Sequence, residues 1–166
     1  MKGVLERVFD AVLRTLARLA AAVFACVAVL IPIDLVLRNA FDASIYGLLD
    51  AIEYGLLAAT FLAAPWVLSI NAHVSVDLLV AALAGRPRQL ADTLANLVGA
   101  GTAAVFLWFA VVAAAQSIER GTMIRTAFVI PEWWVLALAP VSMGLILIEF
   151  ARRLLRGGGA NVRTGL

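Results

Sequence analysis

Residues 19–37 read LAAAVFACVAVLIPIDLVL, an apolar run with one charged residue near its end. The hydrocarbon core of a bilayer is about 30 Å thick, and a helix of about 20 apolar residues crosses it. Lipid offers the backbone no hydrogen-bond partner, so a segment that spans it must be helical. The run therefore predicts a transmembrane helix.

The composition of the whole chain supports a membrane protein. Of 166 residues, 64% are hydrophobic and 14% are charged, and the mean hydropathy is +1.01. Soluble domains have roughly half their residues apolar and about a quarter charged. A soluble fold would have to expose most of this apolar surface. The single cysteine, Cys26, cannot form an intrachain disulfide.

Three further segments have the length and apolarity of spanning helices, namely 51–70, 90–115 and 133–150. No small-residue cleavage site follows the first run, so we read it as an uncleaved helix rather than a signal peptide. We therefore expect an all-α, polytopic membrane protein with four transmembrane helices, forming a single membrane domain over 1–166. Residues 157–166 are expected to be a flexible tail.

The 13 basic residues divide unevenly between the two sides of this arrangement. Ten lie on the side of the termini: Lys2, Arg7, Arg14, Arg18, Arg86, Arg88, Arg152, Arg153, Arg156 and Arg163. The other side has Arg38, Arg120 and Arg125. Because cytoplasmic segments carry the excess of Lys and Arg, both termini are predicted to be cytoplasmic.

The segment 1–18 has its own pattern. Its apolar residues share one helical face, while its charged residues fall largely on the other. This pattern predicts an amphipathic helix lying in the cytoplasmic interface. The alternative is an ordinary extension of the first spanning helix into water.

Several short patterns predict helix ends and contacts. Pro131 and Glu132 are typical of a helix start, and Trp133 and Trp134 of an interfacial aromatic belt. In the third helix, small residues repeat every four positions and predict close helix packing: Ala95, Gly99 and Ala103. Proline lies inside the other three helices and predicts kinks or carbonyls satisfied by neighbours: Pro32, Pro65 and Pro140.

The charged residues lie at helix ends. Asp34 and Arg38 are spaced for an ion pair, and Glu149 lies near two arginines. Asp50 and Glu53 resemble a capping box at the start of the second helix. No carboxylate, lysine or arginine falls at mid-membrane, where coupled carriers usually place acidic groups. We expect no cofactor, no metal site and no nucleic-acid partner, and no enzyme activity, because no nucleophile–base arrangement is evident.

The stretch 69–79, SINAHVSVDLL, places Asn71, His73 and Asp77 just after the second helix. The apolar sequence continues to Ala84, so residues 51–84 would form a helix of roughly 50 Å, too long for an upright span. The extension 71–84 either continues the tilted helix or lies in the inner interface. The polar group there is either a contact that only fixes this bend or a docking site.

Together these features resemble the small membrane subunit of tripartite ATP-independent periplasmic (TRAP) transporters. The resemblance rests on four motifs over roughly residues 15–155: Arg38 ending the first helix, Glu53 opening the second, A-H-V-x-V-D-L-L at 72–79, and IPEWW with a mid-helix proline in the fourth.

The resemblance implies a small scaffold subunit in the bacterial inner membrane. Its partners would be a large membrane subunit, a periplasmic substrate-binding protein and the surrounding lipids. The complex would carry out sodium-coupled symport of an organic acid. Arg38, Glu53, Asn71, His73 and Asp77 would be polar residues with a structural or subunit-interface role. The alternative from a different class is a self-sufficient four-helix transporter acting as a homodimer. An anchor for a redox enzyme is disfavoured, because one histidine cannot supply a pair of haem ligands.

Overall fold

The computed structural model describes residues 2–70 and 86–155. Its elements are α1 (Lys2–Phe41), α2 (Leu48–Ser69), α4 (Arg86–Arg120), β1 (Met123–Arg125), β2 (Val129–Pro131), α5 (Glu132–Leu136) and α6 (Leu138–Leu155). Four helical stretches in the described part of the chain are long and apolar enough to cross a membrane: Glu6–Phe41, Leu48–Ser69, Thr93–Arg120 and Glu132–Leu155. The prediction of four spanning helices is confirmed. The extension 71–84 and the tail 157–166 lie outside the described residues.

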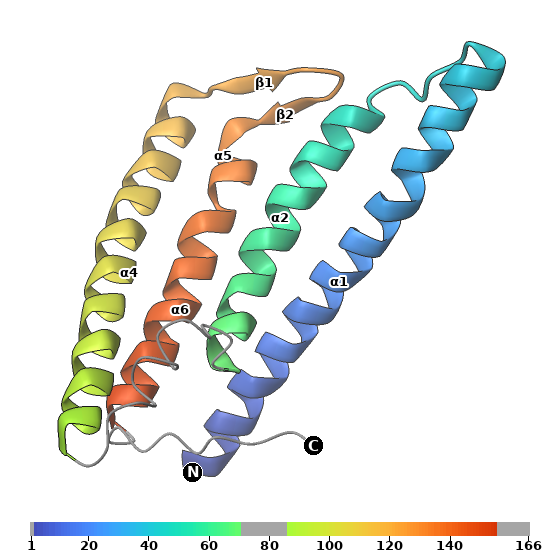
Figure 1. Ribbon diagram of the computed structural model, residues 1–166. Helices are drawn as coiled ribbons and strands as arrows, with labels where there is room; N and C mark the ends of the chain where they lie inside the picture. Colours follow the sequence, from blue (N-terminus) through green and yellow to red (C-terminus); the bar gives the residue numbers. More distant parts are fainter. Residues whose placement is uncertain (1, 71–85, 156–166) are drawn as a thin grey trace, which may run out of the picture.

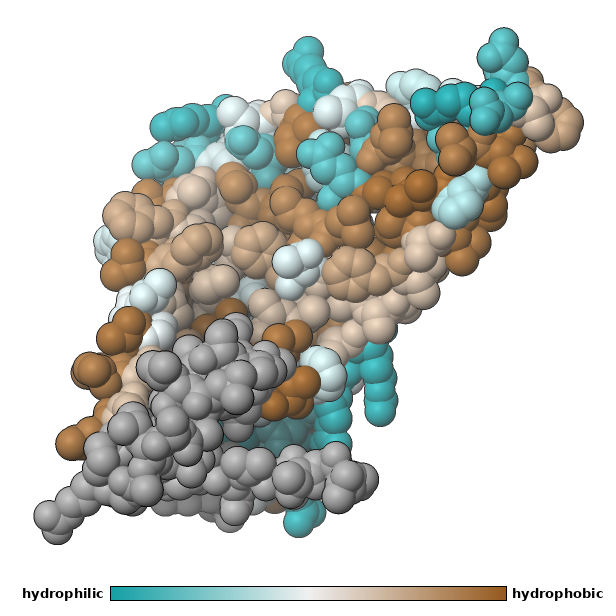
Figure 2. Space-filling model, viewed as in Figure 1, coloured by the Kyte–Doolittle hydropathy of each residue, from teal (hydrophilic) through white to brown (hydrophobic). Residues whose placement is uncertain are grey.

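The helices lie side by side in one row, in the order α1, α2, α6, α4 (Figure 1). Neighbours in this row pack on each other, and α1 and α4 form its two edges. A row of this kind encloses little core, so most apolar side chains stay exposed. In Figure 2 apolar residues cover the middle of the visible face, and hydrophilic residues gather toward its ends. This distribution matches a bilayer around the middle of the row.

Helix α1 runs without a break from Lys2 to Phe41. The prediction of a separate helix over 1–18 is therefore wrong, because this segment is the first part of α1 itself. The physical reason is that no glycine or proline interrupts the helix between Gly3 and Pro32. Packing holds the extension as well, because Leu13 is only 1% exposed.

Helix α4 continues five residues beyond the predicted end, to Arg120. Gly121 stops it with φ +62°, a left-handed conformation that glycine adopts without strain. The N–H of Gly121 donates to the Ile118 carbonyl at 3.2 Å, and the N–H of Thr122 donates to the Ser117 carbonyl at 3.4 Å. This pair of bonds is a Schellman motif, which satisfies carbonyls at the helix end.

The fourth span is divided into α5 and α6 at Ala137. Pro140 explains the division, because it has no N–H to donate to the carbonyl of Leu136. The chain still continues in the same direction, since the Ala137 N–H bonds the Trp133 carbonyl at 2.9 Å and the Val141 N–H bonds the Ala137 carbonyl at 3.4 Å. The helix starts where the sequence predicted, but Pro131 is the N-cap residue of α5 rather than part of its first turn, and Glu132 is the first residue of the helix.

Between α4 and α5 the chain forms a two-stranded antiparallel hairpin that the sequence did not predict. Its register pairs Met123 with Pro131, Ile124 with Ile130, and Arg125 with Val129. Two of these pairs contain β-branched residues, which favour extended backbone. The fold is therefore four spanning helices with one small hairpin at the end that joins α4 to α5 (Figure 1).

The seam between α4 and α6 confirms the predicted small-residue contact at two of its three positions, Gly99 and Ala103, whereas Ala95 is exposed. Ala103 is 4% exposed. A Cβ added at Gly99 would clash with the ring of Phe150, because it would lie far closer to the ring than real contacts allow. Glycine therefore lets the aromatic ring of one helix rest on the backbone of the other.

Candidate functional site

Asp34 and Arg38 form an ion pair near the end of α1, as predicted. Arg38 Nη2 lies 2.8 Å from Asp34 Oδ2, and the Asp34 side chain is 9% exposed. The other carboxylate oxygen of Asp34 accepts a hydrogen bond from the backbone N–H of Ile45 at 3.1 Å. Asp34 therefore connects Arg38 to the loop that leads into α2.

The predicted capping box at Asp50 and Glu53 is wrong. Helix α2 begins at Leu48, and its N-cap residue is Gly47, which has no side chain to cap with. The carboxylate of Asp50 instead accepts a hydrogen bond of 2.6 Å from the backbone N–H of Ala127, in the loop of the β-hairpin. Glu53 is exposed, and the structure gives it no hydrogen bond or ion pair with another described residue.

Further contacts fasten the hairpin to α2. The Tyr46 hydroxyl donates to the Ala127 carbonyl at 3.5 Å, and the hydroxyls of Tyr54 and Thr126 lie 3.4 Å apart. A Cβ added at Gly47, where φ is +73°, would lie 2.9 Å from the Phe128 ring. The start of α2 and the hairpin thus form one packed unit.

Helices α4 and α5 meet the hairpin through a second group of polar residues. Ser117 Oγ donates to Glu132 Oε2 at 2.9 Å, and the Thr122 hydroxyl donates to the same oxygen. The backbone N–H of Glu132 donates to the Thr122 carbonyl at 3.1 Å. Ser117 is 4% exposed, so this carboxylate satisfies a buried hydroxyl.

At the ends of the helices away from the hairpin lies an ionic network, which we call the Arg152 cluster: Asp10, Glu149, Arg152 and Arg153. Arg152 lies 3.0 Å from Asp10 Oδ1 and 3.1 Å from Glu149 Oε2, and Arg153 lies 3.5 Å from Glu149 Oε1. The Arg152 guanidinium also stacks on the Phe9 ring, with its carbon 4.6 Å from the ring centroid.

The cluster joins three helices at their ends away from the hairpin. Asp10 comes from α1, the other three residues from α6, and Arg153 also donates to the carbonyl of Leu68 in α2. The sequence predicted the neighbourhood of Glu149 and the two arginines but missed Asp10, which is 142 residues from Arg152. Because the Glu149 side chain is only 8% exposed, its charge depends on these arginines.

Asn71, His73 and Asp77 lie outside the described residues. Helix α2 ends at Ser69, and Ile70 still donates its N–H to the Trp66 carbonyl at 3.2 Å. The stretch that carries the three predicted residues therefore begins three residues after Leu68, whose carbonyl accepts a hydrogen bond from Arg153 of the Arg152 cluster.

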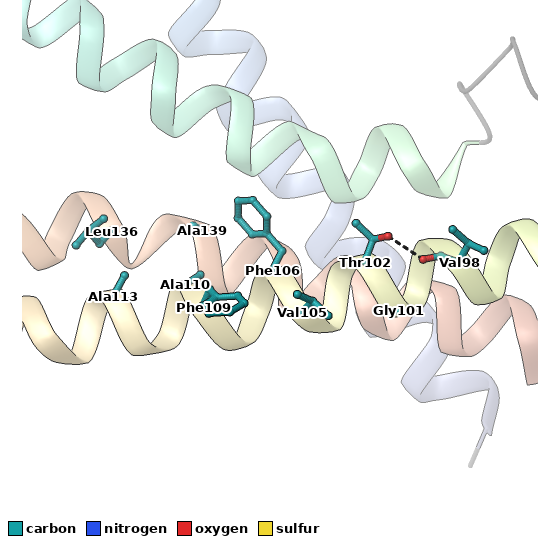
Figure 3. Close-up of a pocket in the computed structure, with 10 residues that line it drawn as sticks. All are labelled: Val98, Gly101, Thr102, Val105, Phe106, Phe109, Ala110, Ala113, Leu136 and Ala139. Carbon is teal, nitrogen blue, oxygen red and sulfur yellow. Dashed lines mark hydrogen bonds between the residues drawn. The ribbon is translucent and has the colours of Figure 1, made fainter.

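The middle of the row is apolar, and it has a groove of about 860 Å³ between α4 and the α5–α6 span (Figure 3). Thr102 is the one lining residue with a polar side chain, and its hydroxyl donates to the Val98 carbonyl of its own helix at 2.9 Å. Among the described residues, no three potential metal ligands come together. The groove suits hydrocarbon rather than a charged solute.

Four apolar spans with polar networks at both ends define a small polytopic membrane protein. The family model for tripartite ATP-independent periplasmic transporters, DctQ component, matches residues 27–158, and the chain belongs to that family. It is a small permease component of a TRAP transporter, which confirms the resemblance noted in the sequence. No curated protein and no solved structure matches the chain.

Proposed function

We propose that this chain is a non-catalytic scaffold subunit. It would support the large membrane subunit during sodium-coupled uptake of an organic acid, which a periplasmic binding protein delivers. One observation carries the proposal: in the described residues, charged side chains lie near the ends of the helices rather than at mid-helix. Between Leu19 and Ile33, and between Tyr54 and Ser69, no residue is charged.

A carrier that moved an organic anion by itself would need a polar site near the middle of the membrane. In the described part of the chain, the groove at that depth is lined almost wholly by apolar residues. The Ser142 hydroxyl also lies within α6, but it donates to the Phe61 carbonyl of α2 at 2.7 Å. This bond holds two helices together, so it supports a structural role.

The row itself favours a scaffold. A closed bundle hides its apolar faces inward, whereas a single row exposes a broad apolar surface on each side. One surface can contact lipid while the other packs against the helices of a larger subunit. Association of helices within lipid depends on close packing and interhelical hydrogen bonds.

The proposed orientation has both termini in the cytoplasm, because ten of the 13 basic residues lie on that side. The hairpin and Arg38 would then face the periplasm. Reporter fusions placed after Gly157 should behave as cytoplasmic. Periplasmic activity of the fused reporter would contradict this topology.

We further propose that Asn71, His73 and Asp77 dock the large subunit, with Arg38 and Glu53 as additional polar residues at the interface or in its support. His73 and Asp77 are spaced i,i+4, as in a helical pair. Losing one member of a buried ion pair usually costs several kcal/mol, whereas an exposed pair contributes about 0–1 kcal/mol.

A co-purification experiment distinguishes a docking role of His73 and Asp77 from an exposed pair that contributes nothing to docking. Asp77→Ala should reduce recovery of the large subunit and lower uptake, and His73→Ala should do so more mildly, because a neutral imidazole is less costly to lose than a carboxylate. Glu119→Ala, which removes an exposed carboxylate from α4, is the matched control and should leave both unchanged. If Asp77→Ala and His73→Ala assemble and transport like the parent, the docking role is wrong.

A further inference from the structure

The first five turns of α1 present three different faces. One face packs inward, where Phe9 meets Arg152 and where Leu13 and Ala20 are each 1% exposed. A second face carries three exposed arginines, Arg7, Arg14 and Arg18. At about 100° per residue, these arginines fall within roughly 40° around the helix axis.

The third face is an exposed valine stripe, formed by Val4, Val8 and Val12. These side chains are 66%, 55% and 42% exposed, and they lie at i,i+4 spacing beside the arginine face. The valine stripe is not the face that packs inward, because Phe9, Leu13 and Ala20 lie on a different side of the helix. A basic row beside an apolar row is the pattern of a surface that meets lipid headgroups and the upper part of the acyl chains.

The three arginines are not neutralised within the described chain. Asp10, the acidic residue between Arg7 and Arg14, is paired with Arg152. Arg14 donates from Nε to the Asp10 carbonyl at 3.1 Å, which leaves its charge uncompensated. For Arg7 and Arg18 the structure gives no hydrogen bond or ion pair with any described residue.

The positions of these unpaired arginines along the axis of α1 indicate what they can contact. The Arg152 cluster marks the charged end of the row, and Asp10 belongs to it. Arg14 and Arg18 lie about 6 and 12 Å further along the helix axis, toward the apolar middle. Side chains of a helix tilt toward its N-terminus, so both guanidinium groups can reach back toward the charged end along the surface of α1.

We infer that the arginine face of α1 binds the phosphate of an anionic phospholipid, with the acyl chains running from there toward the apolar middle beside Val12 and Leu19, which are 42% and 53% exposed. Charge complementarity selects the headgroup, because three cations stand on one exposed face. The adjoining exposed apolar side chains select a lipid rather than a free anion. This inference concerns a surface at the edge of the row, and it is tested on the chain without the large subunit.

The test measures lipid retention by the purified full-length chain with native mass spectrometry. Phosphatidylglycerol and phosphatidylcholine are added at equal concentration to the parent chain, to R14Q/R18Q and to R120Q/R125Q. The last variant is the matched control, because it removes two exposed arginines from the hairpin end. Each basic residue near an anionic surface is worth about fivefold in affinity, so R14Q/R18Q should bind phosphatidylglycerol roughly 25-fold more weakly.

The parent and R120Q/R125Q should prefer phosphatidylglycerol over phosphatidylcholine to the same degree. R14K/R18K, which keeps both charges, should retain the preference and provides a folded comparison if R14Q/R18Q proves unstable. Equal binding of the two lipids by the parent would overturn the inference. So would phosphatidylglycerol binding that R14Q/R18Q leaves unchanged, or displacement of the lipid by millimolar inorganic phosphate.

Discussion

At the scale of single residues, Arg152 has the most consequential contacts. Its guanidinium meets carboxylates from two helices and stacks on Phe9. Glu149, which it pairs with, is 6% exposed as a residue. A buried carboxylate that loses its cation has neither water nor a full counter-charge, so the cost exceeds that of an exposed pair. The same residue therefore stabilises α6 and connects it to α1.

Arg152→Ala should lower the free energy of unfolding by about 2–3 kcal/mol, somewhat less than the usual cost of about 3–5 kcal/mol for breaking a buried pair, because Arg153 still lies near Glu149. The measurement is reversible unfolding in mixed detergent micelles. Arg152→Ala combined with Glu149→Gln should cost less than Arg152→Ala alone, since the stranded charge is gone. Arg120→Ala, an exposed control, should change stability by less than about 0.5 kcal/mol. Equal losses for Arg152→Ala and Arg120→Ala would show that the cluster is a solvated contact.

At the scale of elements, the hairpin and the start of α2 form a unit held by one charge-assisted hydrogen bond. Asp50 accepts it from the backbone of Ala127. Asp50→Ala should expose that N–H to solvent and loosen the hairpin loop. Hydrogen bonds to charged groups are worth about 1.5–3 kcal/mol, which corresponds to roughly tenfold faster amide exchange or more.

Hydrogen–deuterium exchange of peptides covering 122–131 measures this effect. Asp50→Asn is the matched variant, because its amide oxygen can still accept the bond, and its exchange should lie between those of the parent and Asp50→Ala. Glu53→Ala, one turn further along α2, should leave exchange in these peptides unchanged. Identical exchange in the parent and Asp50→Ala would mean that the hydrogen bond from Ala127 to Asp50 does not hold the hairpin loop.

The elements also show what the sequence could and could not predict. The four spans were predictable, because length and apolarity alone require them in lipid. The hairpin was not, because its strands are three residues long and its anchors, Asp50 and Tyr54, lie 77 and 72 residues away from their partners in the chain. Nor could local pattern show Asp10 meeting Arg152, since only the row of helices brings them together.

At the scale of the whole molecule, the row of four helices is an incomplete arrangement by itself. It buries few of its apolar side chains, and its described charged residues stand near its two ends. Membership of the DctQ family agrees with this shape, because the family consists of components of tripartite transporters. The central claim is that the chain supports transport without carrying substrate.

The most direct test is uptake by proteoliposomes under an inward sodium gradient, using the organic acid that the cognate binding protein is first shown to bind. Three preparations are compared in the presence of that binding protein: this chain alone, the large membrane subunit alone, and both together. The account predicts uptake only when both membrane subunits are present. Uptake by this chain alone would contradict it and would support the self-sufficient homodimeric transporter.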